Sequence, residues 1–160
     1  MSITLQTIDH RQATALLPVL SELLVDAVAS GASVNFMQGF EAAEARAYWE
    51  RQIAALAAND RIWIVAEEAG AVVGMVMCIF APQPNQPFRA EISKMLVHSS
   101  QRRRGIGALL MTGIEEAALA AGKTLLVLDT AAGGAGDRLY RRMGWTCLLY
   151  TSDAADEEDS

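Results

Sequence analysis

A basic turn with two glycines is the stretch of this 160-residue chain whose residue types most plainly suggest chemistry. Arg102, Arg103 and Arg104 precede Gly105 and Gly107, and a helix is predicted to begin there, directly after an apolar strand. The first N–H groups of a helix have no intrahelical acceptor, and they add to the positive end of the helix dipole. Glycine has no Cβ to hold a ligand away from the backbone. The turn therefore predicts a phosphate or diphosphate site.

Two well-known phosphate motifs do not match this turn. No Gly-Lys-Ser/Thr follows it, so it is not a P-loop. The third glycine of the dinucleotide-binding fingerprint is absent as well. A solvated basic turn would have the same composition, so composition alone leaves phosphate binding and simple solvent exposure about equally open.

The elements that must position this turn can be read from hydrophobic periodicity and from Gly, Pro and Asp signals. Asp9 is the expected N-cap of the first helix, and Pro18 should kink or restart that helix. The segment 125–128 is nearly all apolar, which is typical of a strand buried on both faces. The order predicts an α/β protein with a mixed sheet and helices on both faces. Strands are expected over residues 3–8, 62–66, 72–80, 90–97, 125–128 and 145–150, and helices over 10–29, 40–58, 105–121 and 135–142.

Composition predicts one domain over residues 1–146, with an acidic tail over 147–160. The chain is 52% hydrophobic, but its net charge of −6 is uneven: residues 1–88 carry −5, residues 89–146 carry +4 and residues 147–160 carry −5. A pI near 4.9 disfavours nucleic acid as a partner. No signal peptide or membrane span is visible, and Cys78 and Cys147 match no metal spacing. We therefore expect a cytoplasmic protein without a metal.

A second motif, Leu139-Tyr140-Arg141-Arg142-Met143-Gly144-Trp145, gives the turn a context. Together with Arg102-x-x-Gly105-x-Gly107 it resembles the GCN5-related N-acetyltransferase (GNAT) superfamily. The resemblance implies acetyl-CoA as co-substrate and a GNAT fold of the α/β (α+β) class. That fold has a mixed, mostly antiparallel sheet of six to seven strands, splayed at strands 4 and 5 and flanked by about four helices. Segments 31–37, 89–91 and 128–130 are similar to the tabtoxin-resistance group, whose relatives include antibiotic-modifying enzymes.

The resemblance also implies roles for individual residues. Tyr140 matches the tyrosine that protonates the departing CoA thiolate, although a helix residue filling the core would look the same. The strand backbone should pair with the pantetheine arm, and the turn should hold the diphosphate. The implied cofactor-binding residues are Leu96, Val97, Arg102, Arg103, Arg104, Gly105, Ile106, Gly107, Ala108 and Tyr140.

Two carboxylates are candidates for the base that deprotonates the attacking amine. Glu91 and Asp129 both lie among apolar residues in the sequence, where an unpaired carboxylate would be costly. A cationic substrate would relieve that cost. A salt bridge to Arg89 or Lys94 would relieve it equally well, so a structural role stays open for each.

The acceptor site in this superfamily lies largely on the first two helices and their loop. The candidate contacts here are Asp26, Ser33, Asn35 and Phe36, together with Glu91 and Asp129. Phe36 would more commonly be a packing residue. The acidic first block suits a cationic amine, and aminoglycosides are the obvious class. A tabtoxin-like amino acid, a protein or peptide substrate, and a non-catalytic acyl-CoA-binding module are the alternatives.

The tail departs from the superfamily pattern. Residues 147–157 resemble translated library adapter sequence, which suggests a metagenomic or library-derived gene whose natural last strand has been replaced. A sheet edge exposed in this way could support a homodimer.

Overall fold

A computed structural model describes residues 2–30, 41–130 and 134–147, and the chain forms two compact units, Met1–Leu128 and Asp129–Ser160. Among the described residues, the first unit contains five strands and four α-helices, and the second contains one α-helix. The elements are β1 Ile3–Thr7, α1 His10–Ala15, α2 Leu17–Ala29, α3 Ala42–Leu56, β2 Arg61–Glu68, β3 Ala71–Phe80, β4 Arg89–Val97, the 3₁₀ turn η1 Ser99–Gln101, α4 Ile106–Ala120, β5 Leu125–Val127 and α5 Ala135–Arg142.

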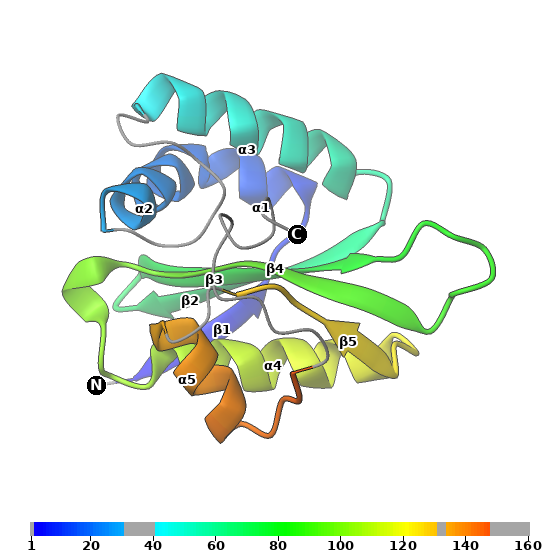
Figure 1. The fold of residues 1–160 in the computed structure, drawn as a ribbon. Coiled ribbons are helices and arrows are strands. Elements are labelled where there is room, and N and C mark those ends of the chain that lie inside the picture. Colours follow the sequence, from blue (N-terminus) through cyan, green and yellow to red (C-terminus); the bar gives the residue numbers. More distant parts are fainter. Residues whose placement is uncertain (1, 31–40, 131–133, 148–160) are drawn as a thin grey trace, which may run out of the picture. The chain divides into compact units, whose positions relative to one another are not determined.

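The sheet has the strand order β1-β2-β3-β4-β5. Neighbours from β1 to β4 are antiparallel, and β5 pairs with β4 in parallel. Helices α1, α2 and α3 cover one face, and α4 covers the other (Figure 1). The expected α/β class with a mixed, mostly antiparallel sheet is confirmed.

The numbers of elements differ from the expectation. Five strands are described instead of six or seven, and five α-helices instead of about four. Trp145, Thr146 and Cys147 are not a strand, and the remainder of the expected last strand, 148–150, lies outside the described residues. The additional helix arises because the chain restarts as α2 at Leu17, with Pro18 in the first turn, where a missing N–H costs nothing.

Local signals set most element boundaries. The Asp9 carboxylate accepts the Gln12 N–H at 2.8 Å, while the Gln12 side chain accepts the Asp9 N–H at 2.9 Å, which is a complete capping box. Ala69 (φ 51°) and Gly70 (φ 83°) form the two-residue turn of the β2–β3 hairpin. Two positive φ angles in such a turn match the right-handed twist of the strands that it joins.

The core on the α1–α3 side is built around two buried tryptophans. Trp49 and Trp63 pack with ring centroids 5.2 Å apart, and both are fully buried. The Trp49 Nε1–H donates to the Leu20 carbonyl at 2.8 Å, so α3 is joined to α2 by a buried hydrogen bond as well as by apolar contact. This packing holds α2 on the sheet, where it contacts β3 and β4.

The prediction that segment 125–128 is buried on both faces is wrong for the described residues. β5 spans only Leu125–Val127; Leu125 is 44% exposed, and Leu126 and Val127 are half-buried. β4 is the only described strand that pairs with β5, so β5 lies at the sheet edge. An apolar run does not distinguish a central strand from an edge strand whose side chains are partly covered.

Candidate active site

β4 and β5 separate soon after they begin. Their pairs run from Arg89 opposite Leu125 to Glu91 opposite Val127, whereas β4 continues to Val97. Within the described chain, no strand pairs with the β5-facing edge of residues 92–97. The splay expected between strands 4 and 5 is therefore present, and it leaves backbone groups of β4 open to an added extended ligand.

A bulge lies within this open part of β4. Met75 pairs with Leu96 but Met77 pairs with Ser93, so β4 has one more residue than β3 between these pairs. Lys94 has φ 52°, an uncommon left-handed conformation for a residue other than glycine. Bulges of this kind bend a strand and redirect its side chains, and they are common beside functional sites.

The basic turn follows β4 directly. His98 leads into η1, Arg103 has φ 64°, and Gly105 has φ 78° as the N-cap of α4. A Cβ added at Gly105 would meet no atom within 4 Å, so this glycine is needed for its backbone conformation and not for space. The strand-to-helix turn is thus sharp and depends on left-handed residues.

No side chain among the described residues caps the N-terminus of α4, and the first turn of this helix contains no acidic residue. The first backbone donor with an acceptor is the Leu109 N–H, bonded to the Gly105 carbonyl at 3.1 Å. In the described chain, the N–H groups of Ile106, Gly107 and Ala108 therefore have no acceptor. Free N–H groups at a helix start bind phosphate groups well, so these residues fit the diphosphate of coenzyme A.

The three arginines of the turn are not equivalent. Arg102 and Arg103 are exposed, and among the described residues neither side chain has an ion-pair or hydrogen-bond partner. Arg104 instead forms a two-fold ion pair with Glu68 at the end of β2, with N–O distances of 2.9 and 2.5 Å. It also donates to the Gln101 side chain. The ion pair lowers the pKa of the Glu68 carboxyl. Arg102 and Arg103 are thus the turn's arginines without such an ion pair.

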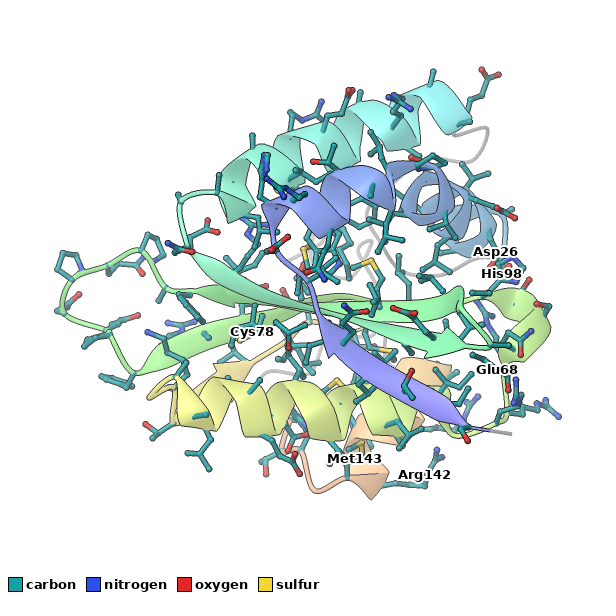
Figure 2. All side chains as sticks on the ribbon, turned by 180° about the vertical axis from the view of Figure 1, so that it is seen from behind. Asp26, Glu68, Cys78, His98, Arg142 and Met143 are labelled. Carbon is teal, nitrogen blue, oxygen red and sulfur yellow. The ribbon has the colours of Figure 1, made fainter. Side chains whose placement is uncertain are left out.

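Asp26, an expected acceptor contact, bonds to the start of the turn. Its carboxylate accepts the Ser99 N–H at 2.8 Å and the Ser99 hydroxyl at 2.5 Å. The His98 Nε2 lies 3.6 Å from the same carboxylate. Because His98 Nδ1 accepts the Ser100 N–H at 3.1 Å, the neutral ring carries its proton on Nε2, facing Asp26. Figure 2 shows Asp26 and His98 side by side.

The two candidate bases are both exposed. Glu91 lies on β4 at the splay, and Asp129 begins the second unit. The expectation that both carboxylates would be surrounded by apolar residues is wrong, because neither pays a large cost of burial. Burial lowers the pKa of Lys94, and the negative charge of Glu91 opposes part of this effect. Lys94 Nζ lies 5.5 Å from the centre of the Tyr48 ring.

Tyr140 lies on α5 in the second unit. Its side chain is 9% exposed, and its ring centre is 6.2 Å from that of Trp145. Burial raises the pKa of the Tyr140 phenol above its ordinary value of 10.0. The phenol is therefore protonated at neutral pH, as a proton donor must be.

The structure joins some of the predicted site residues and leaves others undescribed. Residues 102–105 form the turn, residues 106–108 continue it as the first turn of α4, and Leu96 and Val97 lie on the open part of β4. Ser33, Asn35 and Phe36 lie outside the described residues. The sequence did not single out Glu68 or Ser99. Glu68 bonds to Arg104, 36 residues away in the sequence, and Ser99 bonds to Asp26, 73 residues away. No local pattern marks such contacts.

No helix among the described residues has the length and apolar character to cross a bilayer. No group of three or more His, Cys, Asp or Glu side chains among them is placed to hold a metal ion.

Among the described residues, a mixed sheet that opens beside β4, and a helix after β4 whose first N–H groups have no acceptor, form an α/β fold with room for an extended anionic ligand. The sequence model of the "Acetyltransferase (GNAT) family" matches residues 27–145. The chain belongs to this family, and it is an N-acetyltransferase that uses acetyl-CoA as co-substrate.

Solved structures agree on the fold at low sequence identity. yncA from Salmonella typhimurium, solved with its cofactor acetyl-CoA, has a TM-score of 0.70 and 21% identity over 93% of this chain and 82% of that chain. PaiA N-acetyltransferase from Thermoplasma acidophilum, in complex with coenzyme A, has a TM-score of 0.68 and 16% identity over 91% of each chain. The aminoglycoside acetyltransferase HMB0005 from an uncultured soil metagenomic sample has a TM-score of 0.64 and 23% identity over 96% of this chain and 97% of that chain.

Proposed function

We propose that this protein transfers the acetyl group of acetyl-CoA to a primary amine of a small cationic molecule, with an aminoglycoside-type antibiotic as the leading acceptor class. The observation that carries the cofactor half of the proposal is the uncapped start of α4, where the N–H groups of Ile106, Gly107 and Ala108 have no described acceptor. Arg102 and Arg103 add positive charge beside these donors. The open edge of β4, including Leu96 and Val97, would pair with the pantetheine arm.

The reaction needs a base and an acid. Glu91 or Asp129, directly or through water, accepts a proton from the amine, whose nitrogen bonds to the acetyl carbon. The carbon–sulfur bond breaks, and the departing thiolate takes a proton from Tyr140. The raised pKa of the Tyr140 phenol supports this role, because it keeps the proton on the side chain until the thiolate forms. The products are an N-acetylated amine and free CoA thiol.

Charge supports a cationic acceptor. Residues 1–88 carry a net charge of −5, and Glu91 is exposed on β4 at the splay. An exposed carboxylate beside the reacting amine favours a cationic ligand through long-range attraction. The similarity to an aminoglycoside acetyltransferase over 96% of this chain is consistent with that acceptor class.

A second candidate is an amino-acid-like acceptor of the tabtoxin type. The observation that favours it is Lys94, whose charge interacts with that of Glu91 on the same strand. An amino acid carries an amine for Glu91 and a carboxylate for Lys94, whereas a polycation would be repelled by the lysine.

A panel of acceptors tests the proposal. Release of CoA thiol from acetyl-CoA is measured with aminoglycosides, amino-acid-like toxins and peptides at equal concentration. We expect the highest kcat/KM with an aminoglycoside. A preference for amino acids would select the second candidate, and a preference for peptides would select a peptide N-acetyltransferase. Tight CoA binding without turnover on any amine would contradict the proposal and indicate an acyl-CoA-binding module.

A further inference from the structure

Two carboxylates lie against a turn that, by the proposed function, must bind an anion. Asp26 bonds to Ser99 before the turn, and Glu68 bonds to Arg104 within it. Figure 2 shows Asp26 and Glu68 at the same end of the sheet, on either side of the loop that follows β4. Negative charge at this place opposes diphosphate binding, so its presence needs an explanation.

We propose that Asp26 and Glu68 are positioning residues that hold the turn in its binding conformation before the cofactor arrives. This inference rests on the proposed function of residues 102–108. Asp26 on α2 holds Ser99, which precedes the turn, and Glu68 on β2 holds Arg104 within it, so the turn is attached to the core at both places. A turn fixed in advance loses less conformational entropy when it binds its ligand.

The turn needs this support because its backbone is unfavourable by itself. Arg103 has a positive φ of 64°, and Gly105 has one of 78°. A left-handed conformation at a non-glycine residue persists only where the surroundings hold it. Arg104 lies between these two residues, and its two-fold ion pair with Glu68 restrains both of its neighbours.

Asp26 should have the larger effect. It accepts two hydrogen bonds from Ser99, one from the backbone and one from the hydroxyl, and its side chain is only 16% exposed. Hydrogen bonds to a charged acceptor are stronger than those between neutral groups. The Glu68 side chain is about as exposed, at 17%, but its hydrogen bonds come from the Arg104 side chain and not from the backbone, and ion pairs near the surface contribute little.

The contact also links the two halves of the reaction. Asp26 lies in the last turn of α2, whose C-cap is Ser30, directly before the segment 31–40 that is expected to contact the acceptor. The same side chain is bonded to the residue that starts the cofactor turn. Asp26 thus acts on cofactor affinity through Ser99, which makes it a positioning residue and not a catalytic one.

Calorimetric titration with CoA and steady-state kinetics test the inference. We expect Asp26→Ala to raise the Kd for CoA and the KM for acetyl-CoA about tenfold, and Ser99→Ala about threefold, while kcat at saturation stays within about twofold. Glu68→Ala should raise the Kd about twofold. Glu22→Gln on α2 and Glu67→Gln on β2 are the controls, because each removes one negative charge. Neither side chain bonds to another described residue, so both variants should bind CoA like the wild type.

The direction of change separates positioning from simple charge. Asp26→Asn keeps the shape of the side chain and removes its charge, so tighter CoA binding by this variant would overturn the inference. Unaltered affinity in Asp26→Ala and Ser99→Ala would overturn it too, as would a raised acceptor KM with unaltered CoA affinity. Ser99→Ala changes no charge and keeps the test valid if Asp26→Ala fails to fold. If the wild type bound no CoA, the proposed function would fail first, and this inference with it.

Discussion

Glu91 on β4 lies opposite Val127 on β5 in the last residue pair that joins these two strands. The exposed carboxylate therefore stands where the sheet opens, at the start of the β4 edge that we assign to the pantetheine arm. A base at this point can meet an amine that approaches the opened edge from solvent.

Glu91→Gln should lower kcat about 10²-fold or more, because the amide cannot accept the proton of the attacking amine. The Kd for CoA should stay near that of the wild type. Single-turnover kinetics and calorimetry measure the two quantities separately. Asp129→Asn is the matched variant, since it removes the other candidate base; wild-type turnover in Glu91→Gln together with a large loss in Asp129→Asn would transfer the role to Asp129.

Tyr140→Phe should lower kcat about 10²-fold through loss of the proton for the thiolate. Burial raises the pKa of the phenol above 10.0, so the protonated form predominates at every pH below that value. Ionisation of Tyr140 should consequently cause no fall in the kcat of the wild type between pH 8 and 10. A fall in that range, present in the wild type and absent in the variant, would show that the phenol ionises too easily for the assigned role.

Much of the fold could be predicted from short-range pattern. The Asp9 cap and the restart of the helix around Pro18 each depend on a few neighbouring residues, and each is confirmed. Helix α5 begins and ends at the predicted residues, 135 and 142.

Features that depend on distant residues were not predicted. The exposure of β5 depends on which strands pair beside it, and the contact of Asp26 with Ser99 joins residues 73 positions apart. The bulge at Lys94 is a mismatch between two strands and has no signature in either one. The order of elements and a helix that begins directly after the basic turn could therefore be predicted, but the contacts that hold this turn to α2 and β2 could not.

Gly74→Ala should destabilise the protein, because the new Cβ would lie 2.9 Å from the Leu96 carbonyl oxygen and 3.1 Å from Leu110 Cδ1. Overpacking of this kind costs about 1–3 kcal/mol, and a shift in Tm of several degrees follows. Gly113→Ala is the control. Its Cβ meets the flexible end of Leu5, which is 37% exposed, and helix propensity favours alanine by about 1 kcal/mol. Equal loss of Tm in both variants would contradict the packing argument.

Cys78 should be unreactive in the folded protein. Burial raises the pKa of its thiol to about 11, so only about one thousandth of it is thiolate at pH 8. Cys147 is exposed. A thiol reagent at pH 8 should therefore modify one cysteine per chain rapidly, and both in denaturant. Cys147→Ser should abolish the rapid phase, and a rapid phase that survives this substitution would contradict the burial of Cys78.

The most direct test of the central claim is calorimetric titration of CoA into the wild type and the variant Ala108→Glu. A glutamate in the first turn stabilises a helix, but here it would place negative charge among the N–H groups that we assign to the diphosphate. The account predicts that Ala108→Glu keeps or raises Tm and weakens CoA binding at least about tenfold, while Ala108→Gln binds nearly as well as the wild type. Equal CoA affinity in Ala108→Glu and the wild type would contradict the assignment of this turn.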